Sequence, residues 1–169
     1  MKYLIVVDMQ NDFISGSLGS PQAQAIVEGV KKKIENYNGK IIFTRDTHFE
    51  DYLTTQEGKN LPVAHCVKDS WGWQITDKLL PYAKTVVDKI TFGSVDLPKL
   101  IKDYGEKIDE IEILGLCTDI CVISNAMILK ASFPEVKIVV NGKLSAGATN
   151  EGHQNALEAM KAVQIEVIE

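Results

Sequence analysis

The sequence has little that would tie it to a membrane or a nucleic acid. No apolar run approaches the roughly 18 residues that span a bilayer, and the N-terminal segment MKYLIVVD has too short an apolar stretch and no small-residue cleavage site for a signal peptide. Lysine and arginine (18) are outnumbered by aspartate and glutamate (23), so no basic surface is expected to follow phosphates. We therefore expect a cytoplasmic protein that binds neither membranes nor nucleic acids.

Cysteine is also scarce. Three cysteines, an odd number, in a chain without a secretion signal predict reduced thiols rather than a disulfide framework. Repeats, low-complexity tracts and linkers are missing as well. A chain of 169 residues with 45% hydrophobic content is long enough for one buried core and short for two, so we predict a single domain over residues 1–169.

Short apolar runs alternate with amphipathic segments along the chain. Runs rich in β-branched residues predict strands buried on both faces, at 3–7, 40–44, 85–87, 111–114, 136–140 and 165–168. Apolar residues at helical spacing predict helices around 25–37, 76–80, 97–104, 120–131 and 150–162. This alternation predicts an α/β fold, a doubly wound and mostly parallel sheet of about six strands with helices on both faces. Residues 45–74 lack periodicity, and a loop of that length in a compact domain is usually functional.

The segment EILGLCTDICV, from Glu112 to Val122, predicts a strand that turns directly into a helix. Cys121 then lies in the first helical turn, where free N–H groups and the positive dipole end favour a thiolate. Asp8 and Lys89 follow other strands, and the carboxyl ends of parallel strands converge. A carboxylate can take the thiol proton and a lysine can stabilise both anions, so these residues predict a catalytic group. The alternative is a strand-end cap, a solvated lysine and an inert core thiol.

The remaining cysteines and one histidine are expected to have other roles. If the chain turns tightly at Leu116–Cys117, the backbone N–H groups of Cys117 and Cys121 would point at one spot and stabilise an oxyanion. Cys66 is expected to pack in the core, because it would face away from its neighbour in an extended chain. His153, at the start of the last predicted helix, is expected to be structural.

A second group of polar residues lies in the irregular segment. Asp46 and His48 are two residues apart and share one face of an extended chain, and His65 follows with Glu57 between them. Carboxylate and imidazole donors without a thiolate suit a divalent Zn, Mn or Fe ion with open positions for water or substrate. The alternative is that these are surface polar groups of a long loop.

Five ordered blocks, VVDMQNDF, TRDTH, HC, DKITFGS and GLCTDICV, carry a resemblance over essentially the whole chain. The chain resembles the isochorismatase-like cysteine hydrolases, and within them the nicotinamidase/pyrazinamidase branch. The resemblance implies a catalytic triad of Asp8, Lys89 and Cys121. It implies deamidation of nicotinamide, and of pyrazinamide, to the acid and ammonia through a thioester. A small-molecule amide is therefore the expected partner. Family members are often dimers or larger, so a homo-oligomer is compatible with the resemblance, but no residue pattern in this chain decides between a monomer and a homo-oligomer.

The same resemblance assigns further positions. It places metal ligands at Asp46, His48 and His65, with Glu57 as a fourth ligand in some bacterial members, and makes zinc the first expectation. It implies a cis peptide at Leu116–Cys117. It also implies contacts with the substrate from four residues, Gln10, Phe13, Phe92 and Leu116.

Two stretches depart from the pattern of nicotinamidases. NLPVAHC lacks the tryptophan that often precedes the metal histidine, and Asp69-Ser70 stand where Gly-Thr is usual. Trp71 or Trp73 is a candidate replacement for the missing aromatic wall. The departures leave open a cysteine amidohydrolase for another small amide or carbamoyl compound. A metal-dependent hydrolase in which Cys121 is structural is a more distant alternative, and a non-catalytic binding protein the least favoured.

Overall fold

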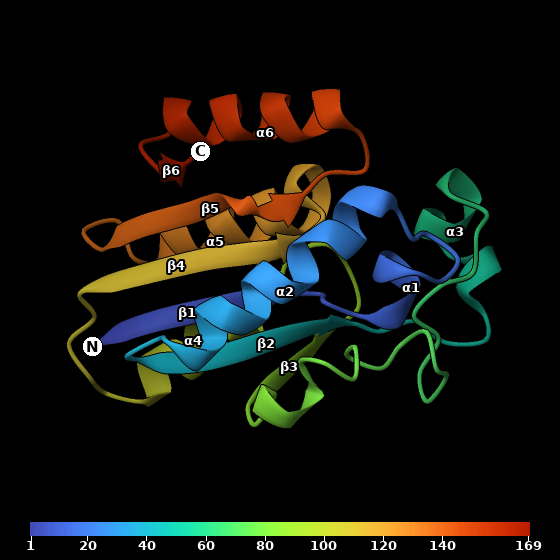
Figure 1. The fold of residues 1–169 in the computed structure, drawn as a ribbon, viewed down its shortest axis with the longest axis horizontal. Helices are drawn as coiled ribbons and strands as arrows, with labels where there is room; N and C mark the ends of the chain where they lie inside the picture. The colour runs from blue at the N-terminus through green and yellow to red at the C-terminus, as the bar shows by residue number, and fades with distance from the viewer.

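A sheet in the order β3-β2-β1-β4-β5-β6 forms the centre of the molecule (Figure 1). The computed structural model describes residues 1–169, and every pair of neighbouring strands is parallel. The doubly wound α/β sheet is thereby confirmed, and it is parallel throughout. The strands are β1 Lys2–Val7, β2 Lys40–Asp46, β3 Val86–Lys89, β4 Glu110–Leu116, β5 Lys137–Ala146 and β6 Glu166–Ile168.

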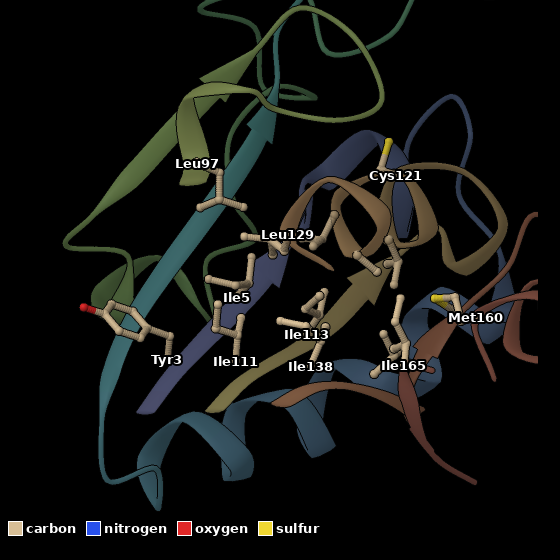
Figure 2. Packing of buried hydrophobic residues seen from close by; sticks show 14 of the residues in the cluster. Tyr3, Ile5, Leu97, Ile111, Ile113, Cys121, Leu129, Ile138, Met160 and Ile165 are labelled. Atoms are coloured by element: carbon tan, nitrogen blue, oxygen red, sulfur yellow. The ribbon is translucent and has the colours of Figure 1, made fainter. Parts of the chain in front are cut away.

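Helices cover both faces of this sheet because side chains alternate along its strands. Leu4 and Val6 of β1 pack with α2, whereas Ile5 and Val7 pack in a second cluster with α4, α5 and α6. Figure 2 shows this second cluster with Tyr3 at one end and Cys121 at the other. None of the helices has the length and apolar character needed to cross a membrane. The helices are α1 Asn11–Ile14, α2 Pro21–Glu35, α3 Gln56–Asn60, α4 Asp96–Asp103, α5 Ile123–Ser132 and α6 Asn150–Ala162.

Several elements differ from the sequence prediction. No helix forms at 76–80; turns lead instead to the short 3₁₀ helix Leu80–Tyr82, where Pro81 removes a backbone donor. β5 continues six residues past position 140, to Ala146. The irregular segment contains α3 and the 3₁₀ helix Tyr52–Thr54, and a π-helical turn, Thr118–Val122, precedes α5.

The order of the strands indicates at which edge of the sheet a functional site is expected. The chain builds outward from β1 to β2 and β3 on one side, then returns to β4 on the other, so the connections diverge at the carboxyl end of β1. At this end Gly115 of β4 approaches β1 so closely that a Cβ atom would lie 2.2 Å from the Val7 carbonyl oxygen. Gly115 also has φ of 121°, which a side chain disfavours. A glycine is therefore required where β4 leads into the Cys121 segment.

Candidate active site

Asp8, Lys89 and Cys121 meet at the carboxyl ends of β1, β3 and β4. The Lys89 Nζ lies 2.6 Å from Asp8 Oδ2 and 3.5 Å from the Cys121 Sγ. All three residues are buried, with at most 4% of their surface exposed. The structure thus brings together the three residues that the sequence singled out as a catalytic group.

Asp8 is held in an uncommon backbone conformation. Its φ is 47°, in the left-handed region that residues other than glycine seldom adopt. Thr44 of β2 fixes it there: the Thr44 hydroxyl donates to Asp8 Oδ1 at 2.7 Å, and the Asp8 N–H donates to the Thr44 carbonyl at 3.2 Å. One carboxylate oxygen is therefore anchored, and the other faces Lys89.

Lys89 balances several negative groups. Its ammonium donates to Asp46 Oδ1 at 3.3 Å and to the Thr91 carbonyl at 3.0 Å, besides its ion pair with Asp8. Burial lowers the pKa of Lys89, but the carboxylate of Asp8 and the other neighbouring anions outweigh burial and raise it. Lys89 is therefore a permanent cation that links Asp8 to Asp46.

Burial opposes ionisation of the Cys121 thiol. Burial raises the pKa of Cys121 well above its usual value, and the nearby Asp8 carboxylate raises it further, although Lys89 opposes both. Burial also raises the pKa of Asp8, against the effect of Lys89. Burial therefore opposes the thiolate that the helix-end position favours.

The chain turns sharply just before Cys121. A cis peptide joins Leu116 to Cys117, as the sequence resemblance implied. The N–H groups of Ile120 and Val122 both donate to the Cys117 carbonyl, at 3.1 and 3.0 Å. The Cys117 N–H itself makes no hydrogen bond to the protein, so it is available to an acceptor in the site.

A cavity of about 450 Å³ opens beside these groups. It reaches Cys117 and Cys121 at one side and the carboxylate and imidazole of Glu57 and His65 at the other. Most of the remaining lining is apolar, which suits a small and largely uncharged ligand. The apolar lining includes Phe13, Leu18, Leu61, Phe92, Leu116 and Ile120.

Gln10, expected at the substrate, does not line this cavity. Its buried side-chain amide donates to the carbonyls of Asp46 at 2.8 Å and Trp73 at 2.9 Å, and its Oε1 accepts from the Asp46 N–H at 2.8 Å. The amide is occupied by the backbone. Gln10 therefore fixes the end of β2, where Asp46 lies, instead of contacting a ligand.

Neither Trp71 nor Trp73 lines the cavity, so the prediction that one of them replaces the missing aromatic wall is wrong. Trp71 is 58% exposed on the surface. Trp73 stacks on the guanidinium of Arg45 at 3.5 Å and donates its indole N–H to Thr47 Oγ1 at 2.9 Å. An aliphatic side chain, Leu61, lines the cavity shortly before His65 in the chain.

The four predicted metal ligands form one cluster, in which Asp46, His48 and His65 are buried and Glu57 is partly exposed, and their donor atoms all lie within 4.8 Å of one another. His48 Nε2 is 2.8 Å from Asp46 Oδ2 and 3.4 Å from Glu57 Oε1. His65 Nε2 is 3.5 and 3.7 Å from the same two oxygens. Ligands about 2.1 Å from a tetrahedral ion lie roughly 3.4 Å apart, so this donor set fits a divalent cation such as zinc.

Neighbouring groups orient this cluster. His65 Nδ1 donates to the Val63 carbonyl at 2.8 Å, so Nε2 is the ring nitrogen that faces Asp46 and Glu57. The Tyr52 ring packs against both imidazoles, at centroid distances of 4.7 and 5.0 Å. Although burial opposes it, hydrogen bonding to His48 and His65 keeps the pKa of Asp46 below its usual range, so this carboxylate stays charged.

Other residues have structural or unforeseen positions. Cys66 packs in the core, as expected. His153 Nδ1 lies 2.8 Å from Thr118 Oγ1 and takes no part in the cluster, consistent with a structural role. Two further residues of the site were not predictable from the sequence: Thr44, whose hydroxyl anchors Asp8, and Asn125, whose amide donates to the Cys121 carbonyl. The only signal for Asn125 was a polar residue in an apolar helical segment, and that signal is weak.

Comparison with known proteins gives a consistent result. A family model described as "Isochorismatase domain" matches residues 2–169. A nicotinamidase of Saccharomyces cerevisiae is 31% identical in an alignment that is 176 positions long and covers 75% of this chain and 80% of that protein. The structure of a pyrazinamidase of Pyrococcus horikoshii in complex with zinc matches with a TM-score of 0.86 and 27% identity, over 99% of this chain and 98% of the other. The nicotinamidase PncA from Bacillus subtilis matches with a TM-score of 0.79 and 27% identity, over 99% of each chain.

Proposed function

The chain belongs to the isochorismatase family, in its nicotinamidase/pyrazinamidase branch, and on that premise we propose that it deamidates nicotinamide, and pyrazinamide, to the acid and ammonia. The observation that carries this proposal is the buried group of Asp8, Lys89 and Cys121, of which Cys121 lines a largely apolar cavity. A carboxylate, a cation and a thiol in contact provide a base, a charge balance and a nucleophile.

The first half of the reaction forms a thioester. Asp8 takes the proton from Cys121 Sγ, and the thiolate attacks the carboxamide carbon. The N–H groups of Cys117 and Cys121 stabilise the oxyanion that develops on the carbonyl oxygen. The C–N bond then breaks as Asp8 returns the proton to the departing amine, which leaves as ammonia. Lys89 holds a compensating positive charge throughout.

The second half releases the acid. Asp8, again a carboxylate, takes a proton from a water molecule, which attacks the thioester carbon. The C–S bond breaks, and Cys121 regains its proton as the carboxylic acid leaves. The net reaction consumes one amide and one water and yields one acid and one ammonia.

The metal cluster adjoins the same cavity, since Glu57 and His65 line it. Asp46, His48, Glu57 and His65 would hold a divalent ion, with zinc the first choice and manganese or iron the alternatives. When bound, the ion offers a Lewis-acid position for a ring nitrogen of the substrate. Phe13, whose ring lies 5.5 Å from that of His65, provides an apolar face against which a flat ring can pack.

A second candidate substrate class is favoured by the lining of the cavity. Phe13 and Phe92 are its only aromatic residues, and Leu61 contributes an aliphatic wall beside the metal cluster. Such a lining also accepts an amide or carbamoyl compound without an aromatic ring. The catalytic steps at Cys121 would be the same.

Ammonia release tests the function directly. We expect purified, reduced protein supplied with Zn or Mn to release ammonia from nicotinamide and pyrazinamide, because their planar rings fit between the apolar walls. A panel of aliphatic amides and carbamoyl compounds measured in parallel provides the comparison. Activity confined to those compounds would retain the cysteine chemistry and overturn the substrate assignment.

Metal binding can be tested apart from activity. We expect the wild-type protein to bind one zinc ion per chain, and Glu57→Gln or His65→Ala to weaken binding by about 100-fold or more, because each removes a donor. Asp69→Asn, an acidic residue outside the cluster, is the matched control and should bind zinc as the wild type does. The measurement is zinc content after dialysis against a graded chelator series. Equal retention by all four proteins would contradict the assigned ligands.

A further inference from the structure

Asn125 joins two separate parts of the site. It lies in α5, one helical turn after Cys121, and is fully buried. Its Nδ2 donates to the Cys121 carbonyl at 2.8 Å and to the Phe92 carbonyl at 3.2 Å, and its Oδ1 accepts from the Ser94 N–H at 3.0 Å. Every hydrogen bond of this amide is therefore to the backbone, in two segments that are far apart in the sequence, one at Phe92 and Ser94 and the other at Cys121.

Both segments belong to the proposed reaction site. One carries the nucleophile Cys121, and the other follows Lys89 and contributes Phe92 to the cavity wall. The Lys89 ammonium donates to the carbonyl of Thr91 in this second segment. A shift of residues 91–94 relative to α5 would therefore change both the cavity and the surroundings of Lys89.

Side-chain packing does little to fix the wall formed by Phe92. Its side chain is 43% exposed and belongs to neither hydrophobic cluster, so packing contributes little to its position. The next residue, Gly93, lies so close to α5 that a Cβ atom would be 2.5 Å from the Ile128 Cδ1. The backbone of this segment is thus seated directly on the helix, and Asn125 binds it on both sides of Gly93.

From this geometry we propose that Asn125 is a positioning residue that holds the Phe92 wall in register with Cys121 and thereby determines how tightly the amide substrate is bound. The kinetic part of the inference rests on the proposed function. The structural part, the coupling of residues 92–94 to Cys121, does not.

The neighbouring Ser124 provides a matched control. Its hydroxyl donates to the Ile120 carbonyl at 2.6 Å, the same kind of bond to a carbonyl four residues earlier that Asn125 makes to Cys121. Ser124 makes no hydrogen bond to the segment of Phe92. Comparing the two residues separates the bridge between segments from local support of the helix.

Steady-state kinetics on an amide that the wild type hydrolyses tests the kinetic part. Asn125→Thr replaces the amide by a hydroxyl that reaches the carbonyl four residues earlier but not Phe92 or Ser94. We expect it to raise KM about tenfold with kcat within about twofold, and Asn125→Ala to raise KM and also lower kcat about fivefold. Ser124→Ala should keep wild-type values. A wild-type KM in Asn125→Thr would overturn the proposal.

Thiol alkylation tests the structural part without any substrate. With iodoacetamide and site-resolved mass spectrometry, we expect Cys121 to react about tenfold faster in both Asn125 variants, because the segment beside it loosens. Cys66, buried outside these segments, serves as the internal reference. Unchanged Cys121 rates, or an equal rise at Cys66 that reports global loosening, would overturn the coupling. A wild type that hydrolyses no amide would instead overturn the proposed function and leave this test intact.

Discussion

Replacing Cys121 by alanine is expected to lower kcat/KM for amide hydrolysis by about 10⁴-fold or more, since it removes the nucleophile that lies beside Lys89. Zinc content should remain that of the wild type, because Cys121 is not among the donors of the metal cluster. The measurement combines ammonia release with metal analysis on the same preparation. Loss of turnover in a fully metallated protein would locate the defect in the nucleophile.

Cys66→Ala is the control for loss of a thiol. Cys66 is buried in the core beneath α2 and contributes no side-chain hydrogen bond, so its replacement should retain most of the activity. If Cys121→Ala instead remained nearly as active as the wild type, water activated at the metal cluster would be the nucleophile. The more distant alternative, a metal-dependent hydrolase, would then replace the proposed mechanism.

Replacing Lys89 by methionine is expected to damage both activity and stability. The change leaves Asp8 and Asp46 as buried carboxylates without their common cation, which costs about 3–5 kcal/mol of unfolding free energy. Activity should fall by about 10³-fold or more, because Asp8 would be neutralised and could no longer take the Cys121 proton. Urea unfolding and ammonia release measure the two effects separately.

Two further variants isolate the cause. Lys99→Met removes the exposed ion pair of Lys99 with Asp96 and should change stability by no more than about 1 kcal/mol. The double variant Asp8→Asn with Lys89→Met should recover part of the lost stability, because one buried charge disappears, and none of the activity. Wild-type stability in Lys89→Met would contradict the account of Lys89 as the charge that balances this site.

Much of the fold was predictable from the sequence because a parallel sheet buries both faces of its strands. The resulting apolar runs located all six strands, and helical periodicity located α2, α4, α5 and α6. The segment 76–80 was misassigned because its apolar spacing fits a helix, whereas Pro81 favours a short turn there. The extension of β5 was missed because Asn141, Gly142 and Lys143 interrupt its apolar run. Its backbone pairing with β4 nevertheless resumes after them, at Ser145 and Ala146.

The site was predictable where the residue type itself carries the chemistry. Carboxylates, imidazoles and a thiol after strand ends pointed to both groups, and the structure brings each group together. Gln10 and Asn125 were misassigned or missed because their partners are backbone groups far away in the sequence. The raised pKa of Cys121 was not predictable for a related reason: the extent of burial depends on the assembled fold.

The parallel pairing of β1 with β4 has a consequence for biosynthesis. Lys2 is paired with Glu110, so β1 cannot complete its ladder until more than 100 further residues have been made. Contacts this distant in sequence close slowly, and the unpaired edge of β1 is prone to associate with other chains in the meantime. Asp8 and Cys121 come together only when this pair forms. Enzyme activity during synthesis would therefore report the completion of the central sheet, and chains truncated before β4 would be both inactive and prone to aggregate.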